Sequence, residues 1–548
     1  MPALRLQIGV KTLSLLGLGL CICAASTAAP AEQAAAPASA QRALHVLNRL
    51  GYGPAPGDVD RVMSIGVDAY IQEQLHPEDL VDPPALQARL AALRTQQLSA
   101  VDLYADYGPR IRREAGKDQM ALDRVNKLQN QVADETREAR LLRAVYSPAQ
   151  LQEAMVDFWF NHFNVFIDKG QEDKIWTGAY ERDAIRPYAL GSFRQLLGAT
   201  ARSPAMLYYL DNFQSSAVAI DKSGKAHGGL NENYAREVME LHTLGVDGGY
   251  TQKDVTELAR IFTGWTFVPK DMEAHQEPAF RFDAKRHDYE KKVFLGQKFP
   301  AGGGVEEGEH ALDMLAASPA TARHIAFQLA QYFVADQPPP KLVERLARRF
   351  EQTHGDIRET LTTLFASPEF WDPQFVGGKF KTPYQYVVSS LRGSGLPMIA
   401  NVRPLLGAMV QNGQPLYACL TPDGYKNTRD AWLNPDAMIY RLNFANALGN
   451  GNLPLWQRPD DPGQNAPAVA AAGASASNAM DARLMPVASG MPPLHPAAPV
   501  PKPQPPDPFV VQAALGNVFS LDTAEALAAA RPQLRAGLML GSPEFMRR

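Results

Sequence analysis

The stretch "NENYAREVMELHTLGVDGGY", Asn231 to Tyr250, decides the local fold most directly. At 100° per residue, Tyr234, Val238 and Leu241 form the apolar stripe of a helix that packs against a core. The glycine of "LGVD" suits the left-handed residue that ends a helix. The next segment, "TQKDVTELARIF", opens with the threonine and aspartate of a capping box. The sequence therefore predicts a helix, a turn and a second helix.

The first of these helices also carries a polar column on an adjoining face, made by Asn233, Glu237 and Glu240. Two carboxylates three residues apart can share a metal ion or divide acid and base roles, provided that burial moves their pKa values apart. A solvated helix face with an Arg236–Glu240 ion pair produces the same pattern. Spacing alone leaves both interpretations open.

Helical patterns dominate the rest of the chain. Ser-Pro pairs open apolar or helix-forming runs at five places, because serine can cap free amides and proline suits the first helical position. They are found at 147/148, 203/204, 318/319, 367/368 and 542/543. Strand signals are few, and the weakly alternating segment 279–299 predicts one hairpin. We expect a mainly α protein, a large multi-helix orthogonal array with one small β-hairpin.

The chain starts with a segment that resembles an export signal. Arg5 and Lys11 precede or enter an apolar run, and small residues suit a signal peptidase near Ala28. The run is shorter than the ~20 apolar residues of a membrane-spanning helix. We therefore expect a cleaved signal peptide, a periplasmic or extracellular protein, and no transmembrane anchor after signal removal.

Composition divides the chain into five predicted parts. A tract dominated by Ala and Pro has little apolar surface to bury, so we expect it to be disordered. The residues after it include Leu538, Leu540 and Phe545, which need cover and therefore predict docking on the main domain. The parts are a signal peptide 1–28, a linker 29–41, a main helical domain 42–461, the disordered Pro/Ala-rich insertion 462–508 and a C-terminal helical unit 509–548.

The totals and the motifs argue against several classes of protein. The chain has 54 basic and 58 acidic residues, whereas a nucleic-acid-binding protein is usually basic. Loss of the signal removes two of the three cysteines, and Cys419 alone can form no intramolecular disulfide. The sequence has no GxSxG elbow, HExxH zinc helix, Walker loop or EF-hand loop.

Further candidate residues come from distant segments. His162 lies in the aromatic "VDFWFNHFNVF", where a hydrogen-bonded core histidine is the alternative to a ligand. His287 next to Asp288 is a metal-capable dipeptide that also occurs by chance. With Glu237 and Glu240, the two histidines are the predicted ligands of a divalent metal, the candidate cofactor.

Motifs along most of the chain carry a resemblance to a known family. The centre is "NENYAREVMELHTLGVDGGYTQKDVTELARIFTGW", with "WFNHF" and "YYLDN" before it and "HDYEKKVFLG" after it. "HVLNRLGYGPAPGDVDRVMSIGVDAYIQEQL" opens the match, and "KFKTPYQYVVSSLR", "NGQPLYACLTPDGY" and "WLNPDAMIYRLNFANAL" close it. From about Arg42 to Arg548 the chain resembles the uncharacterised bacterial family called domain of unknown function 1800. The resemblance implies an exported, mostly helical protein, often encoded beside a second exported family, and it assigns no reaction.

The family motif includes many polar residues of this chain. This favours a functional site over the interpretation that they form only a solvated surface. The leading hypothesis is an exported enzyme that works on an extracellular or envelope substrate, with Arg49 or Arg236 as an anion holder. Its predicted catalytic residues are Glu237, Glu240, His287 and Asp288. Its predicted binding residues are Arg49, Asp211, Asn231, Asn233, Arg236 and Trp265.

The alternative is a non-catalytic scaffold or binding partner of a companion exported protein. In that case the polar network would fix helix packing through buried hydrogen bonds. The geometry around Glu237 discriminates between the two. A pocket shared with a histidine favours the enzyme, whereas packing against Arg236, Asn231 or Arg260 without a cavity favours the scaffold.

Overall fold

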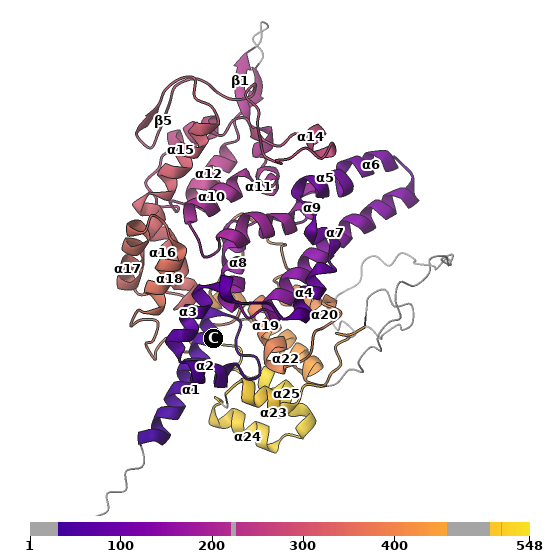
Figure 1. Ribbon diagram of the computed structural model, residues 1–548, viewed down its shortest axis with the longest axis vertical. Coiled ribbons are helices and arrows are strands. Elements are labelled where there is room, and N and C mark those ends of the chain that lie inside the picture. The colour runs from indigo at the N-terminus through magenta and orange to yellow at the C-terminus, as the bar shows by residue number, and fades with distance from the viewer. Residues whose placement is uncertain (1–30, 221–225, 458–504, 517) are drawn as a thin grey trace, which may run out of the picture.

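The computed structural model describes residues 31–220, 226–457, 505–516 and 518–548. The predicted signal peptide and most of the Pro/Ala-rich segment lie outside these residues. Helices make up 61% of the structure and strands 4%, in three two-stranded sheets. The prediction of a mainly α, multi-helix array is confirmed (Figure 1).

The first helices surround α8, which lies near the middle of Figure 1 and buries Leu151, Met155 and Trp159 completely. The helices are α1 (Ala31–Leu50), α2 (Asp58–Ile65), α3 (Val67–Leu75), α4 (Pro84–Ala91), α5 (Ala100–Tyr107), α6 (Pro109–Ala115), α7 (Gln119–Tyr146), α8 (Gln150–His162) and α9 (Gln171–Ala179). Helix α1 begins at Ala31, so it takes in most of the segment expected to be a linker. Alanine, which has the highest helix propensity, is common there.

The middle of the chain contains the short strands. Its elements are a π-helix η3 (Tyr180–Ile185), α10 (Phe193–Arg202), α11 (Pro204–Tyr209), β1 (Ser216–Ile220), β2 (Ala226–Gly229), α12 (Glu232–Glu240), α13 (Gln252–Ile261), β3 (Trp265–Thr266), α14 (Pro269–Glu273), β4 (Arg281–Phe282), β5 (Lys292–Phe294) and β6 (Gln297–Phe299). Helix α12, the turn and α13 are the predicted helix–turn–helix, and Thr251 and Asp254 form the predicted capping box. The hairpin predicted within 279–299 is β5 with β6, while β4 pairs with β3 instead.

The last part of the chain returns to the first. Its helices are α15 (Val305–Ala316), α16 (Pro319–Phe333), α17 (Pro340–Gln352), α18 (Ile357–Phe365), α19 (Pro383–Ser394), α20 (Arg403–Gln411), α21 (Arg429–Trp432), α22 (Pro435–Gly449), α23 (Pro508–Ala514), α24 (Leu521–Ala529) and α25 (Pro532–Leu540). Helix α25 packs on α22, and α23 packs on α19. Main-chain hydrogen bonds join Lys379 to Arg548, so the last residues lie inside the array, beside α1 and α2 in Figure 1.

Two of the five Ser-Pro pairs open helices as expected. Ser203 precedes α11 and Ser318 precedes α16, with proline at the first helical position. At Ser367 and Ser542 the hydroxyl accepts a hydrogen bond from the amide three residues later, but the chain makes a turn and no helix follows. A single turn and a helix share this first-turn geometry, which is why the pattern did not separate them.

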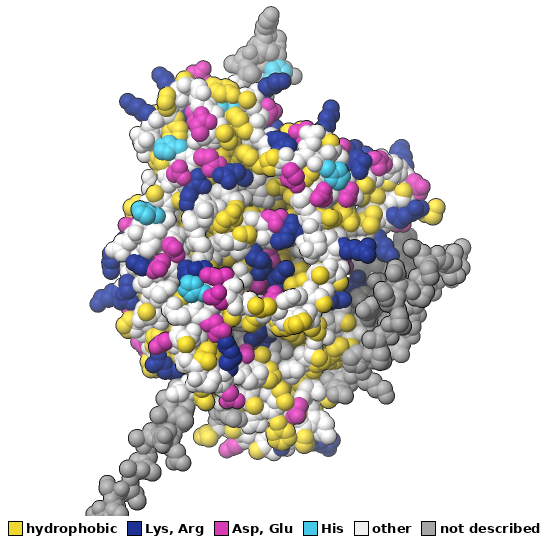
Figure 2. Space-filling model, viewed as in Figure 1, with side chains coloured by type: hydrophobic (Ala, Val, Ile, Leu, Met, Phe, Trp, Pro, Cys, Tyr) yellow, Lys and Arg dark blue, Asp and Glu magenta, His cyan; other side chains and the backbone are white. Residues whose placement is uncertain are grey.

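Acidic and basic side chains are interspersed over the face of the molecule shown in Figure 2. Among the described residues, no helix combines the length and the apolar character needed to cross a bilayer.

Candidate functional site

Five segments of the chain meet around a cavity of about 250 Å³, which we call the histidine pocket. The segments are α8, the residues after α12, α16, the start of α19, and the loop 414–427. The lining residues are Asp157, Phe158, Asn161, His162, Leu241, His324, Gln328, Gln331, Tyr332, Thr382, Gln385, Gln414, Asp423, Tyr425, Lys426 and Asn427.

Local structure explains why these side chains face the same space. On α16, His324, Gln328 and Gln331 recur at helical spacing and share one face. On α8, Asn161 fixes the opposite wall: its Nδ2 donates to Tyr425 O at 2.8 Å and its Oδ1 accepts from Tyr425 N at 2.7 Å. Gly424 comes so close to Asn161 that a Cβ there would lie 2.2 Å from the Asn161 carbonyl oxygen. The loop is therefore fastened to α8.

The imidazoles of His162 and His324 line the pocket, and that of His242 lies next to His162. The ring centroid of His162 lies 6.1 Å from that of His242 and 6.2 Å from that of His324. His162 Nε2 is 3.1 Å from His242 O, so this nitrogen carries a proton and Nδ1 is an acceptor. His324 Nε2 lies 3.3 Å from Leu241 O. Among the described residues, no carboxylate forms an ion pair with any of the three rings.

Burial keeps these imidazoles uncharged. Burial, followed by the neighbouring His324, lowers the pKa of His162 to about 3. The pKa of His242 is well below its usual value through burial and then through His162 and His324. Burial also lowers the pKa of His324. At neutral pH the wall therefore presents hydrogen-bonding rings without charge.

Asp157 belongs to a buried ion-pair network that extends from the pocket into the core. Arg140 binds both Asp157 and Glu181, while Arg186 binds Glu153 at 2.6 Å and lies 3.7 Å from Glu181. The groups joined by these ion pairs are three carboxylates and two guanidiniums, so acids outnumber cations. Burial raises the pKa of Asp157, and the Arg140 charge only partly opposes that effect. Asp157 is therefore the pocket carboxyl that holds a proton more readily than a free aspartate.

Asp423, on the loop, has the opposite environment. Burial alone would raise its pKa, but hydrogen bonds from Lys426 and Thr421 lower it below the usual value. Lys426 Nζ lies 2.7 Å from Oδ2, and Thr421 Oγ1 lies 2.5 Å from Oδ1. The Asp423 side chain is 37% exposed. The histidine pocket thus combines a carboxyl that favours its proton with a carboxylate that favours its charge.

The predicted catalytic glutamates lie beside this pocket rather than on its wall. Glu237 is half-buried and makes no hydrogen bond or ion pair to another described residue. Burial raises its pKa, as do the charges of Glu240 and Asp423. Glu240 accepts a hydrogen bond from Tyr250 at 3.0 Å. Glu237 therefore forms no ion pair with Arg236 or Arg260 and does not line the cavity with a histidine, although the charge of Asp423 on the pocket's loop raises its pKa.

Several predicted binding residues have structural contacts. Asn231 caps α12, since its Oδ1 accepts from Tyr234 N at 2.8 Å. Arg236 donates to Gln252 at 2.8 Å, whereas Asn233 is exposed. Asp211 forms an exposed ion pair with Lys169 at 3.1 Å.

The remaining two predicted binding residues are fully buried. Trp265 packs against Phe262 and Phe280. Arg49 donates to the main-chain oxygens of Phe333 and Phe375. Neither of them lines the histidine pocket.

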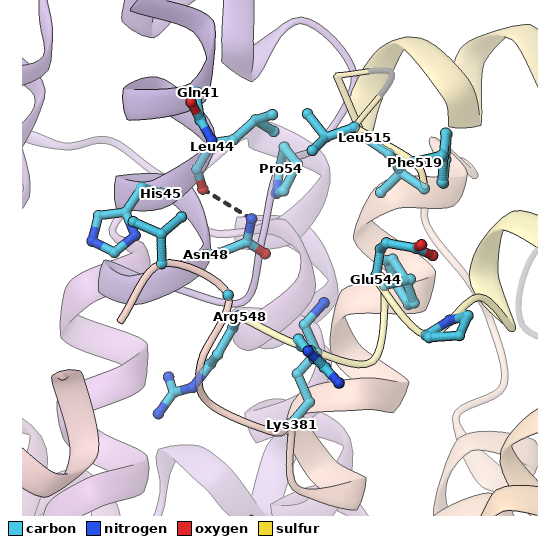
Figure 3. Close-up of a pocket in the computed structure, with 16 residues that line it drawn as sticks. Gln41, Leu44, His45, Asn48, Pro54, Lys381, Leu515, Phe519, Glu544 and Arg548 are labelled. Atoms are coloured by element: carbon cyan, nitrogen blue, oxygen red, sulfur yellow. Dashed lines mark hydrogen bonds between the residues drawn. The ribbon is translucent and has the colours of Figure 1, made fainter. Parts of the chain in front are cut away.

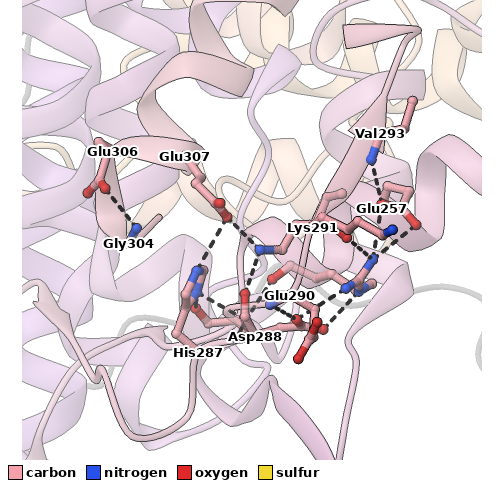
Figure 4. A network of polar contacts seen from close by, with 12 residues as sticks. Glu257, His287, Asp288, Glu290, Lys291, Val293, Gly304, Glu306 and Glu307 are labelled. Carbon is pink, nitrogen blue, oxygen red and sulfur yellow. Dashed lines mark hydrogen bonds and ion pairs between the residues drawn. The ribbon is translucent and has the colours of Figure 1, made fainter. Parts of the chain in front are cut away.

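His287 and Asp288 belong to a separate polar network (Figure 4). His287 Nε2 lies 3.4 Å from Glu307 Oε2, and Lys292 Nζ lies 2.6 Å from the same oxygen. Arg260 binds Asp288 at 2.8 Å and Glu257 at 3.1 Å. We call these six residues the His287 network. Its acids and cations are already paired with one another.

The structure does not bring the four predicted metal ligands together. His162 lies in the histidine pocket, His287 lies in its own network, and Glu237 and Glu240 lie on α12. In the described part of the chain, no group of three or more His, Cys, Asp or Glu side chains is arranged to hold a metal ion. The hypothesis of a shared ion on these four residues therefore has no geometric support.

Sequence reasoning missed most of the pocket. Asp423 stands in "LTPDGY", within a motif that carried the family resemblance, whereas Asp157 stands two residues before the motif "WFNHF". His324, Gln328 and Gln331 lie outside those motifs, and only their helical spacing marks them. The sequence signal for the pocket was a set of polar residues spread over several segments. The polar column on α12 was the stronger pattern.

The family comparison agrees with the resemblance drawn from the motifs. The family model described as "Protein of unknown function (DUF1800)" matches residues 45–547. No curated protein and no solved structure matches the chain.

Proposed function

Because this chain belongs to the DUF1800 family of proteins of unknown function, we propose its activity from the histidine pocket: acid–base hydrolysis of a neutral, hydroxyl-rich polymer outside the cytoplasm. One observation carries the proposal. Two carboxyl groups, Asp157 and Asp423, line one cavity and have pKa values moved in opposite directions. Environments that move the pKa values of two carboxyl groups apart in this way are typical of acid and base roles in one reaction.

The assignment of roles follows from the opposite directions in which the two pKa values are moved. Asp157 donates its proton to the leaving oxygen as the bond between carbon and oxygen breaks. Asp423 accepts a proton from water, and the resulting hydroxide bonds to the carbon. Water is the only co-reactant, and a proton returns from Asp423 to Asp157 through solvent after the products leave. This division matches the two-carboxylate pattern of glycoside hydrolysis.

The rest of the lining supports a sugar-like substrate. Gln331, Gln385, Gln414 and Asn427 contribute amides that both donate and accept hydrogen bonds, as hydroxyl groups require. Phe158 and Tyr332 contribute aromatic surface. His162 contributes a neutral imidazole, which can orient a hydroxyl without attracting an ion. The predicted export signal supports an extracellular or envelope substrate.

The test uses the full chain and a panel of cello-, xylo- and chito-oligosaccharides, with released reducing ends as the measurement. We expect Asp157→Asn and Asp423→Asn each to lower the rate by a factor on the order of a hundred or more. Asp522→Asn is the matched control, because Asp522 is exposed on α24, far in sequence from the pocket. Its rate should equal that of the unchanged protein.

Two results would overturn this proposal. The first is an unchanged protein that cleaves none of the oligosaccharides and whose melting temperature none of them raises. The second is cleavage that Asp157→Asn and Asp423→Asn leave at the rate of Asp522→Asn.

The scaffold remains a second candidate because of the His287 network. Its ion pairs join α13, the segment before β5 and α15, and so fix helix packing without a ligand. A companion exported protein would then be the functional partner. Loss of binding to that partner in variants of α12, with no hydrolysis by the unchanged chain, would favour this candidate.

A further inference from the structure

A second cavity, separate from the histidine pocket, has a volume of about 490 Å³. It lies between α1, the segment that precedes α19, the residues after α23 and the last residues of the chain. Figure 3 shows Leu44, Leu515 and Phe519 at one end, with Lys381 and Arg548 at the other. The volume is within the range of small-molecule sites, and the two ends differ in polarity.

Lys381 is the unusual member of this wall. Its side chain belongs to a residue that is only 2% exposed, and its Nζ lies 4.0 Å from the centroid of the Phe545 ring. Its ammonium group makes no hydrogen bond and no ion pair with any described residue. Burial, followed by the charges of Arg548 and Arg441, lowers its pKa to about 7. A buried ammonium without a counter-ion is costly, so the site favours an anion that would pair with it.

The surroundings of Lys381 add to the positive charge. Five buried cations lie near one another, and we call them the cation cluster: Arg49, Lys379, Lys381, Arg441 and Arg548. Of these, only Lys379 meets a carboxylate within the described residues, that of Asp336.

The three arginines of the cation cluster use main-chain oxygens or aromatic rings instead. Nε and Nη1 of both Arg441 and Arg548 have no hydrogen-bond partner although they are buried. Among the described side chains, one carboxylate therefore pairs with this group of five cations.

The other titratable groups at the cavity do not supply a negative charge that pairs with Lys381. Glu544 is held by the Ser520 amide and by Thr523, and it forms no ion pair with Lys381. His45 donates to Phe370 O at 2.9 Å, and burial and then Arg49 lower its pKa to about 4, so it is neutral. Arg547 is exposed at the cavity and has no ion pair within the described part of the chain.

We propose that this cavity binds an amphiphilic organic anion. Its carboxylate or phosphate head pairs with Lys381, and its apolar body lies along Leu44, Leu515 and Phe519. The head would supply the counter-charge that the cation cluster lacks, and the apolar end would exclude water from that pair. Both parts are needed, because neither a bare inorganic anion nor an uncharged tail satisfies both ends.

The experiment is calorimetric titration of the full chain with four probes: decanoate, decyl phosphate, decanol and inorganic phosphate. We expect one or both of the tailed anions to bind. The one that binds more tightly shows whether the site prefers a carboxylate or a phosphate head. Decanol and inorganic phosphate should bind at least about tenfold more weakly than the better anion. Lys381→Met should weaken that anion by a factor of about 30 or more, because it removes one partner of a buried charge pair.

Two variants keep the test independent of folding. Lys298→Met is the matched control, since Lys298 is exposed on β6 and makes no side-chain contact with a described charge. Leu515→Trp fills the apolar end without changing any charge, so it should also weaken the tailed anions. Lys381→Met keeps most of the side-chain volume and removes an unpaired charge, so its melting temperature should not fall.

Three results would overturn the proposal. They are no binding of either tailed anion to the unchanged chain, equal binding of the better anion by Lys381→Met and Lys298→Met, or binding of decanol as tight as that of the better anion.

Discussion

The histidine pocket and the His287 network use the same kinds of side chain in opposite ways. In the His287 network, His287 and Lys292 share Glu307, and Arg260 joins Asp288 to Glu257. In the histidine pocket, His162 and His324 have no acidic partner among the described residues, and Asp157 and Asp423 line a cavity although each also pairs with one cation. Charged groups that neutralise one another hold elements in place, whereas polar groups left facing a cavity can act on a ligand. Residue type and ion pairing therefore do not separate the two roles; a position on the wall of a cavity does.

The largest expected effect tests the structural side of this comparison. Glu307→Gln leaves the Lys292 ammonium buried without its carboxylate, because Lys292 is fully buried and Glu307 is only 5% exposed at its side chain. The free energy of unfolding should fall by about 3–5 kcal/mol. Urea unfolding followed by tryptophan fluorescence measures it. The double variant Lys292→Met/Glu307→Gln removes both charges and should recover part of the loss. A single variant as stable as the unchanged protein would contradict the structural role.

A smaller effect, which depends on pH, tests the neutral imidazoles. The pKa of His162 is about 3 in the folded chain and its ordinary value is 6.5, so the unfolded chain binds the extra proton between these values. Stability is therefore complete above about pH 6.5 and is lost as the pH falls toward 3. The slope for one histidine is at most about 1.4 kcal/mol per pH unit.

His162→Phe removes the group that takes up this proton in the unfolded chain. Its plot of unfolding free energy against pH should be flatter than that of the unchanged protein between pH 6 and 4, by up to that slope. Urea midpoints measured across this range give the comparison. His242 and His324 still titrate in both proteins, so some acid sensitivity remains. Parallel plots would mean that His162 is not held neutral.

The smallest expected effect concerns Asp211, a predicted binding residue outside both regions. Its ion pair with Lys169 is exposed, with side chains 50% and 37% accessible. Asp211→Asn should change the unfolding free energy by less than about 1 kcal/mol, and oligosaccharide cleavage should be unchanged. Asparagine also tolerates the left-handed backbone at this position, where φ is 59°. A large loss of cleavage with normal stability would restore the predicted role of Asp211.

Much of the fold was predictable because it depends on local signals. The capping box at Thr251, the apolar stripe through Tyr234 and Val238, and the helix start at Ser318 are all visible within a few residues. The site was less predictable because its partners are distant in sequence. Nothing near Asp423 shows that Asn161 will bind its loop, and spacing on α12 could not show that Glu237 adjoins Asp423 rather than a histidine.

The fastening of the loop to α8 has a consequence for how a ligand would enter. Asn161 binds both the amide and the carbonyl of Tyr425, and Gly424 leaves no room for a side chain between them. The loop that carries Asp423 can move away from α8 only if both hydrogen bonds break. Release of this loop from α8 would therefore also displace the charged carboxylate of Asp423, and backbone amide exchange at Tyr425 would report how often the loop is released.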